Sequence, residues 1–222
     1  MPRQPDPELE QRILDAASRL WARGGEKALT MRAVAKASGT TTPTVYERYR
    51  DRDDILRALR LKTRQDLFAA VSRGRTLRES VERYLEFALA NSYSYEVLFD
   101  GVGKPPSLHE HWPSFTLMRE RVAERMHSTP RKQTRLMLAI WSLMHGTAML
   151  IIRGGFEGAL QIQAVHACLD AFDVIMDRVV RAKGLPGSGP KWPSTLILGE
   201  GKQSRIGNGK ESGARARARR KS

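Results

Sequence analysis

The chain has 222 residues, of which 41% are hydrophobic and 28% charged, and its formal net charge is +14 at pH 7. This composition is ordinary for a globular protein and leaves room for one large or two small domains. The single cysteine, Cys168, excludes an internal disulfide framework and any multi-cysteine zinc site, and its apolar helical surroundings predict that it is buried.

Two features predict a cytoplasmic protein that does not enter a membrane. The N-terminal sequence MPRQPDPELEQ lacks the apolar stretch of a signal peptide. No uninterrupted apolar run approaches the roughly 20 residues that a membrane span needs.

The positive charge is unevenly distributed along the chain. Residues 184–222 hold 9 basic and 2 acidic residues, which is half of the net charge. This segment is rich in Gly, Ser and Pro and lacks apolar periodicity, so we expect a disordered basic tail. Its arginines could attract phosphates without regard to sequence, or the tail could be a solvated end with no dedicated partner.

Before this tail, apolar residues recur every three or four positions, and no segment alternates as a strand would, so the predicted fold class is all-α. A first helix is predicted over residues 7–23, where a Gly-Gly pair ends it. Thr30 fits the N-cap of a short second helix that stops near Gly39. A third helix begins at about Thr42, with Pro43 in its first turn.

Longer helices are predicted beyond this point. Asp51 or Asp53 starts a fourth helix that Gly74 closes, with an apolar face made of Ile55, Leu56, Leu59, Leu67, Phe68 and Val71. The later signals are capping boxes at 76–79 and 107–110, a loop GVGKPP at 101–106, a bend or split at Pro113, a helix opened by Pro130, and a last helix at about 158–182.

The two short helices around Ser38, Gly39 and Thr40 have the spacing of a helix-turn-helix, whose second helix enters the DNA major groove. Short hydroxyl side chains at the start of that helix let the backbone approach DNA and bond to phosphates or base edges. The predicted DNA-binding residues are Arg32, Thr41, Thr42, Pro43, Thr44, Tyr46, Arg48 and Arg52. A polar surface turn with solvated arginines is the alternative for any one of them alone.

The segment LTMRAVAKASGTTTPTVYERYRDRDDIL at residues 29–56 resembles the DNA-binding signature of TetR-type transcriptional regulators. The match runs without a gap through Thr30, Val34, Ala35, Gly39, Thr44, Val45, Tyr46, Tyr49, Arg52 and Ile55. Three positions depart from the usual pattern: Tyr49 stands for Phe, Arg52 for Lys, and Glu47 adds a negative charge near the expected DNA face.

The resemblance implies a role for each matched position. Arg32 would reach a guanine edge, and Thr42, Pro43 and Thr44 would touch base edges. Thr41 and Tyr46 would contact phosphates, Arg52 would contact the backbone beyond them, and Tyr49 would pack inward. The segments SYEVLFDG at 94–101 and WSLMHGTAMLI at 141–151 resemble the regulatory domain of the subgroup named for Trp-His-Gly, here Trp141, His145 and Gly146.

An enzyme would need a constellation of reactive side chains, and the sequence offers none. His109 and His111 are two positions apart, which places them on different faces of a helix, whereas a helical metal pair needs a spacing of three or four. His145 fits either a neutral core histidine or a ligand contact. We therefore expect no enzyme, no cofactor and no metal, and keep an unrecognised helical enzyme only as a third hypothesis.

Three parts follow: a three-helix helix-turn-helix DNA-binding domain at 1–52, a larger helical regulatory and dimerisation domain at 53–183, and the tail at 184–222. A helix-turn-helix is complete by about residue 60, so the second domain needs another role. We expect a ligand-responsive transcriptional regulator, specifically a repressor, and keep a constitutive DNA-binding architectural protein as the alternative.

The second domain is predicted to bind a small, mostly apolar effector, because flexible methionines and aromatic rings with polar tips suit such a cavity. The predicted lining residues are Tyr93, Phe99, Phe115, Met118, Met137, Trp141, Met144 and His145, with Tyr93 and His145 as polar anchors. For any single Met or Leu, simple core packing is the alternative.

One helix-turn-helix reads only a half-site, so we expect a homodimer on a near-palindromic operator, with half-sites about 34 Å apart or a multiple of it. The predicted interface is formed by helices at about 131–152 and 158–182. The expected contact surface on the last helix is the apolar stripe Ile162, Val165, Leu169, Phe172 and Met176.

Overall fold

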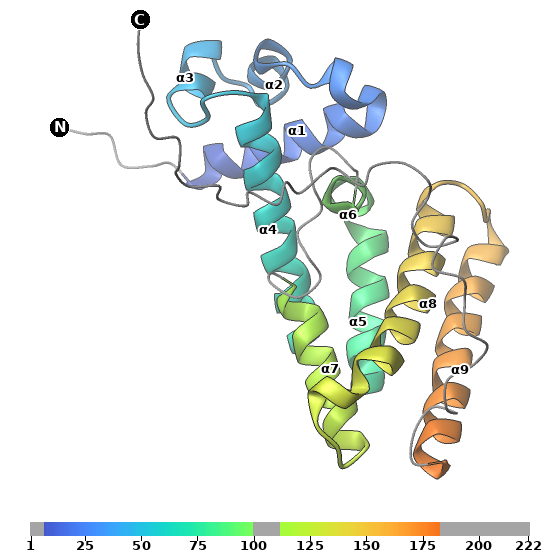
Figure 1. Cartoon of the computed structure of the whole chain (residues 1–222). Coiled ribbons are helices and arrows are strands. Elements are labelled where there is room, and N and C mark those ends of the chain that lie inside the picture. Colours follow the sequence, from blue (N-terminus) through green and yellow to red (C-terminus); the bar gives the residue numbers. More distant parts are fainter. Residues whose placement is uncertain (1–6, 100–111, 183–222) are drawn as a thin grey trace, which may run out of the picture. The chain divides into compact units, whose positions relative to one another are not determined.

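The computed structural model describes residues 7–99 and 112–182, and every regular element in these two ranges is helical, which confirms the all-α fold (Figure 1). The elements are α1 (Pro7–Ala28), α2 (Met31–Ala37), α3 (Thr42–Tyr46), α4 (Arg52–Ser72), α5 (Leu77–Ala90), α6 (Ser92–Phe99), α7 (Pro113–Arg125), the 3-10 helix η1 (Pro130–Gln133), α8 (Thr134–Ile152) and α9 (Ala159–Arg181). The predicted loop at 101–106, the capping box at 107–110 and the tail lie outside the described residues.

The first helix breaks where its Gly-Gly pair predicts. Gly24 and Gly25 have non-helical backbone angles inside α1, and Gly25 has a φ of +56°. A short helical continuation follows the break, so α1 extends to Ala28 as a kinked helix. The left-handed conformation at Gly25 is one that glycine adopts at little cost.

The caps of the next helices agree with the sequence. The Thr30 hydroxyl accepts a hydrogen bond from the Ala33 N–H at 3.1 Å and starts α2. The turn after α2 passes through Gly39, with a φ of +70°. The Asp51 carboxylate accepts from the Asp54 N–H at 2.8 Å, which settles the start of α4.

Two buried clusters organise the described chain, and α4 contributes to both. Ile55, Leu56 and Leu59 pack with α1, α2 and α3, whereas Leu67 and Val71 pack with α5, α7, α8 and α9. Helix α6 also reaches the first cluster, because its Val97 is buried there and α6 contacts both α1 and α4. The helix-turn-helix is therefore attached to the second domain through α4 and α6.

Two local predictions, for Phe68 and Pro130, need correction. Phe68 is 37% exposed and leaves the apolar face of α4, since the neighbouring Leu67 already occupies the buried position. Pro113 stands in the first turn of α7, and the predicted bend or split there stays a prediction, because residues 100–111 lie outside the described ranges. Pro130 opens η1 before α8 begins at Thr134. Cys168 is buried, as predicted.

The apolar stripe of the last helix lies in a different place from the one expected. Leu169, Phe172 and Met176 are buried within the same chain, against α5 and α8. The large apolar residues exposed on α9 are Leu160, Ile162 and Val174. The predicted contact surface with a second copy is therefore wrong for the three buried members, because they already form part of the core.

Helices α8 and α9 are unusually apolar for a chain with this net charge. The segments Pro130–Ile152 and Ala159–Arg181 are long enough to cross a membrane, and each contains an 18-residue stretch with a mean hydropathy of 1.5 and 1.2, respectively. Core helices of globular proteins also have such values, and both helices supply buried residues to the second cluster. Less than half of each segment is buried, which leaves apolar surface on the two helices.

Candidate functional site

Helix α3 is held against the first cluster by one buried face. Val45 is fully buried and Tyr49, just beyond the helix, is 6% exposed. Burial, with the charge of Glu10 second, raises the pKa of the Tyr49 phenol to about 12, so it remains neutral at physiological pH. Tyr49 therefore packs inward and leaves the opposite side of α3 open.

The open side of α3 carries the short polar residues that the sequence singles out. Thr41 and Pro43 are exposed, Thr42 and Thr44 are half-buried, and Tyr46 is 54% exposed. The Thr41 hydroxyl is the N-cap: it accepts from the Thr44 N–H at 3.3 Å and lies 2.8 Å from the Thr44 hydroxyl. This bonding fixes the two hydroxyls at the start of α3.

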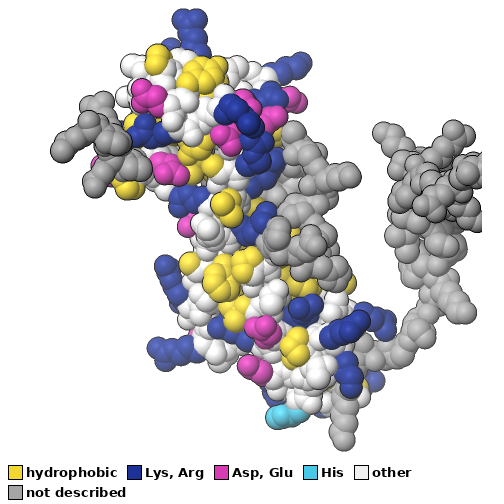
Figure 2. Space-filling model, turned by 60° about the vertical axis from the view of Figure 1, so that its left-hand side comes forward, with side chains coloured by type: hydrophobic (Ala, Val, Ile, Leu, Met, Phe, Trp, Pro, Cys, Tyr) yellow, Lys and Arg dark blue, Asp and Glu magenta, His cyan; other side chains and the backbone are white. Residues whose placement is uncertain are grey.

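The basic residues near α3 differ in their partners. The Arg52 guanidinium bonds Glu26 at 2.7 Å and Asp53 at 3.3 Å, so its charge is partly balanced. Arg32 is exposed on α2 and makes no ion pair within the described ranges. Figure 2 shows lysine and arginine side chains spread over the drawn face with acidic ones between them. The candidate DNA-binding surface is therefore identified by its position on α2 and α3 and not by a higher density of positive charge.

The second domain contains a cluster of aromatic rings and one imidazole between α5, α6, α7 and α8. The Phe99 ring stacks on Trp112 at 5.1 Å and lies 4.3 Å from the His145 ring. The Trp141 ring stacks on His145 at 5.1 Å. We call Tyr84, Tyr95, Phe99, Trp112, Trp141 and His145 the aromatic cluster.

A chain of hydrogen bonds runs through the aromatic cluster. The Tyr84 and Tyr95 hydroxyls are 2.7 Å apart, and the Tyr95 hydroxyl is 2.7 Å from His145 Nδ1. Burial raises the pKa of Tyr84, and hydrogen bonds from Tyr95 and Trp141 offset part of that rise. Burial also raises the pKa of Tyr95 and lowers that of His145, so all three groups are neutral near pH 7.

The structure brings together most of the residues predicted to line the effector site. Phe99, Trp141 and His145 belong to the aromatic cluster, while Phe115, Met118, Met137 and Met144 are buried in the core around it. Tyr93 does not join them, because it is 52% exposed on the other side of α6. Tyr95, two positions later, supplies the polar hydroxyl predicted for Tyr93.

Two protein-family models match separate parts of the chain. Residues 13–59 match the model described as "Bacterial regulatory proteins, tetR family". Residues 77–178 match the model described as "Tetracyclin repressor-like, C-terminal domain". The chain has the two-domain architecture of the TetR family. Among curated proteins, none matches it.

Solved structures share this TetR fold. A protein with unknown function from Rhodococcus sp. RHA1 has 23% identity and a TM-score of 0.60, over 78% of this chain and 96% of its own. A TetR-like transcriptional regulator from the same organism has 21% identity and a TM-score of 0.59, over 81% and 99%. TetR from Acinetobacter baumannii AYE has 13% identity and a TM-score of 0.54, over 78% and 97%. At these identities the likeness shows the fold alone.

The two matched regions contain the candidate DNA-binding residues and the aromatic cluster, respectively. All the predicted DNA-binding residues lie in the first match, and the aromatic cluster lies in the second. Tyr84 and Tyr95 are absent from the predicted site residues, although the sequence contains a signal for Tyr95. Tyr95 precedes Leu98 and Phe99 by three and four positions, so it shares their helix face, whereas Tyr93 does not.

Proposed function

We propose that the chain is a ligand-responsive repressor of the TetR family that binds a near-palindromic DNA operator as a homodimer in the cytoplasm. The observation that carries the proposal is the orientation of α3. Its inner face is anchored by Val45 and Tyr49, while Thr42, Pro43 and Thr44 stand at its open N-terminal end, where a recognition helix contacts base edges.

The remaining residues have separate roles in this proposal. Arg32 adds a base contact from α2, and Thr41 and Tyr46 contact phosphates. Arg48 and Arg52 contact the flanking backbone, and the ion pair with Glu26 holds the Arg52 guanidinium in place. Glu47 is exposed beside them and would repel a phosphate placed directly against it.

Selection from a pool of randomised DNA duplexes tests this assignment. The full-length protein should enrich one half-site motif in two inverted copies, with centres about 34 Å apart or a multiple of it. Recovery of duplexes without a common motif would instead support the alternative function, a constitutive architectural DNA-binding protein, because such proteins bind with little sequence preference.

For the effector, we propose the region of the aromatic cluster. Stacked rings offer an apolar surface, and the neutral His145 and Tyr95 supply polar groups that could orient a ligand. We also propose membership of the Trp-His-Gly subgroup, on the resemblance of Trp141, His145 and Gly146 and on the place of Trp141 and His145 in this cluster. Tyr93 is not part of this proposal, because it faces away from the cluster.

Two substitutions test the effector site. Trp141→Phe and His145→Gln should change the ligand concentration that releases the operator while leaving the ligand-free affinity for DNA nearly unchanged. A ligand shifts DNA binding only as far as it prefers one state of the protein, so a lost contact should alter that preference alone. Parallel loss of folding in both variants would show that the residues serve only the core.

For the homodimer, we propose the outer faces of α8 and α9. On α9 the residues Leu160, Ala164, Ala167, Ala171 and Val174 recur at spacings of four and three and so share one face. On α8 the residues Ala139, Ser142 and Gly146 recur in the same way. Small side chains allow two helices to pack closely, and the exposed Leu160 and Val174 would be covered by a second copy.

A further inference from the structure

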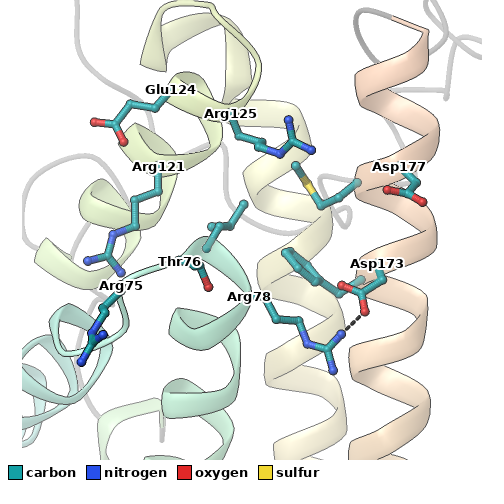
Figure 3. A pocket seen from close by; sticks show the side chains of 11 residues that line it. Arg75, Thr76, Arg78, Arg121, Glu124, Arg125, Asp173 and Asp177 are labelled. Carbon is teal, nitrogen blue, oxygen red and sulfur yellow. Dashed lines mark hydrogen bonds and ion pairs between the residues drawn. The ribbon is translucent and has the colours of Figure 1, made fainter.

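A pocket of about 670 Å³ opens between the start of α5, the C-terminal half of α7 and the middle of α9, and we call it the α5–α7–α9 pocket (Figure 3). It shares no residue with the aromatic cluster. Its volume is within the usual range for small-molecule sites, roughly 300–1,000 Å³. The pocket is therefore large enough for an organic molecule.

One side of the pocket is apolar. Phe172 and Met176 of α9 line it, and both are part of the buried core. Leu77, the first residue of α5, is partly buried beside them. Phe172 and Met176 are only 3% and 7% exposed, so a hydrocarbon body would lie against a wall that is already largely closed to water.

The rest of the lining is rich in arginine, and two of the four arginines already have partners. Arg78 forms ion pairs with Asp173 and, at 3.1 Å, with Glu82. Arg121 donates to the Ser80 hydroxyl, to the Val71 carbonyl at 3.2 Å and to the Ser72 carbonyl at 3.3 Å. These contacts hold the Arg78 and Arg121 side chains in place beside the pocket.

The other two arginines differ. Within residues 7–99 and 112–182, the guanidinium groups of Arg75 and Arg125 make no ion pair or hydrogen bond. Figure 3 shows Arg125 pointing into the space between α7 and α9, while Glu124 points the opposite way. Of the acidic lining residues, Asp173 is paired with Arg78 and Asp177 lies 3.5 Å from Arg181. Positive charge in the pocket is therefore left without a counterpart.

We propose that the α5–α7–α9 pocket is a second ligand site that takes an amphipathic carboxylate. Arg125 binds the carboxylate, whereas Arg75, which Figure 3 shows at the opposite edge of the pocket with its guanidinium pointing away from Arg125, takes no part in binding it. The apolar body lies along Phe172 and Met176. An inorganic anion would use only the charge of the exposed Arg125, and a neutral lipid would contact only the apolar side, so neither matches both halves of the pocket.

Isothermal titration of decanoate into the full-length protein tests this site, with decanol as the neutral probe of similar length. Decanoate should bind, and Arg125→Ala should weaken it by about tenfold, as expected for loss of a hydrogen bond between charged groups. Decanol binding should not change. Arg131→Ala is the matched control, because Arg131 is exposed on η1 outside the pocket and its loss removes the same charge.

The result that overturns the proposal is equal decanoate affinity for Arg125→Ala and Arg131→Ala, or no binding to the unmodified protein. Decanoate could also enter the aromatic cluster, so the titration is repeated with His145→Gln. Unchanged affinity in this variant supports the separate pocket. Loss of affinity in His145→Gln alone would assign decanoate to the aromatic cluster and overturn the second site, without affecting the proposed operator binding.

Discussion

The Tyr95 hydroxyl lies 2.7 Å from Nδ1 of His145 and links α6 to α8 across 50 residues of sequence. Tyr95 is fully buried, and its hydroxyl also meets that of Tyr84. Because α6 packs against α1 and α4 as well, this link connects the core of the second domain with the helices that carry the helix-turn-helix. The stability of the protein should therefore depend on the Tyr95 hydroxyl.

Tyr95→Phe should lower the free energy of unfolding by roughly 1–3 kcal/mol, because it leaves buried polar groups of Tyr84 and His145 without their partner. Urea unfolding measures the change. Tyr93→Phe is the matched control: it removes the same atom from the same helix at an exposed position and should have almost no effect. Equal losses in the two variants would mean that the buried hydrogen bonds contribute little.

The protein should become less stable as the pH falls below about 6.5, the ordinary pKa of histidine. Burial lowers the pKa of His145 in the folded chain, so in this range the unfolded chain binds the proton more readily. Stability from this group is fully present above pH 6.5 and is lost as the pH falls toward the lower, folded pKa. Melting temperatures at pH 5.5 and 7.5 should differ less in His145→Gln, whereas His166→Gln, at an exposed position, should retain the difference.

Ala167→Arg should convert the protein from dimer to monomer in light scattering. Ala167 is exposed at the centre of the proposed α9 face, where a long charged side chain would prevent close packing of a second copy. Gln65→Arg, on the exposed side of α4, adds the same side chain elsewhere and should leave the mass unchanged. A dimeric Ala167→Arg variant would place the interface on another surface.

Deletion of residues 185–222 removes nine basic and two acidic residues. Affinity for random DNA at low salt should fall, because each lost phosphate contact reduces counterion release. The preferred operator should stay the same, since the base contacts are assigned to α2 and α3. A changed motif after selection with the shortened protein would show that the tail takes part in sequence recognition.

Local signals in the sequence predict the helix ends well. Thr30, Asp51 and Thr76 cap α2, α4 and α5 because each has a side-chain oxygen three positions before a free backbone N–H, and this depends only on neighbouring residues. The proposed DNA-binding residues lie in one short segment that includes α2, α3 and the first residue of α4. Their positions at α3 could thus be predicted without knowledge of the tertiary fold.

Choices between similar residues in the second domain could not be made this way. Tyr93 and Tyr95 have the same chemistry. Their spacing to Leu98 and Phe99 places them on different faces of α6, but only the packing of α6 against α5 and α8 decides which face is buried. Likewise, an apolar stripe on α9 could face its own core or a second copy, and the position of α5 determines that Phe172 is internal. Such contacts join residues far apart in sequence, where periodicity carries no information.

The most direct test of the central claim, that α3 reads DNA sequence, compares two variants on the selected operator and on a scrambled duplex by fluorescence anisotropy. Thr44→Ala should cost roughly 1–3 kcal/mol on the operator and almost nothing on the scrambled duplex, because it removes a base contact. Arg52→Ala should weaken both duplexes alike, because it removes a phosphate contact. Equal losses on both duplexes for Thr44→Ala would contradict the assignment of α3 as the recognition helix.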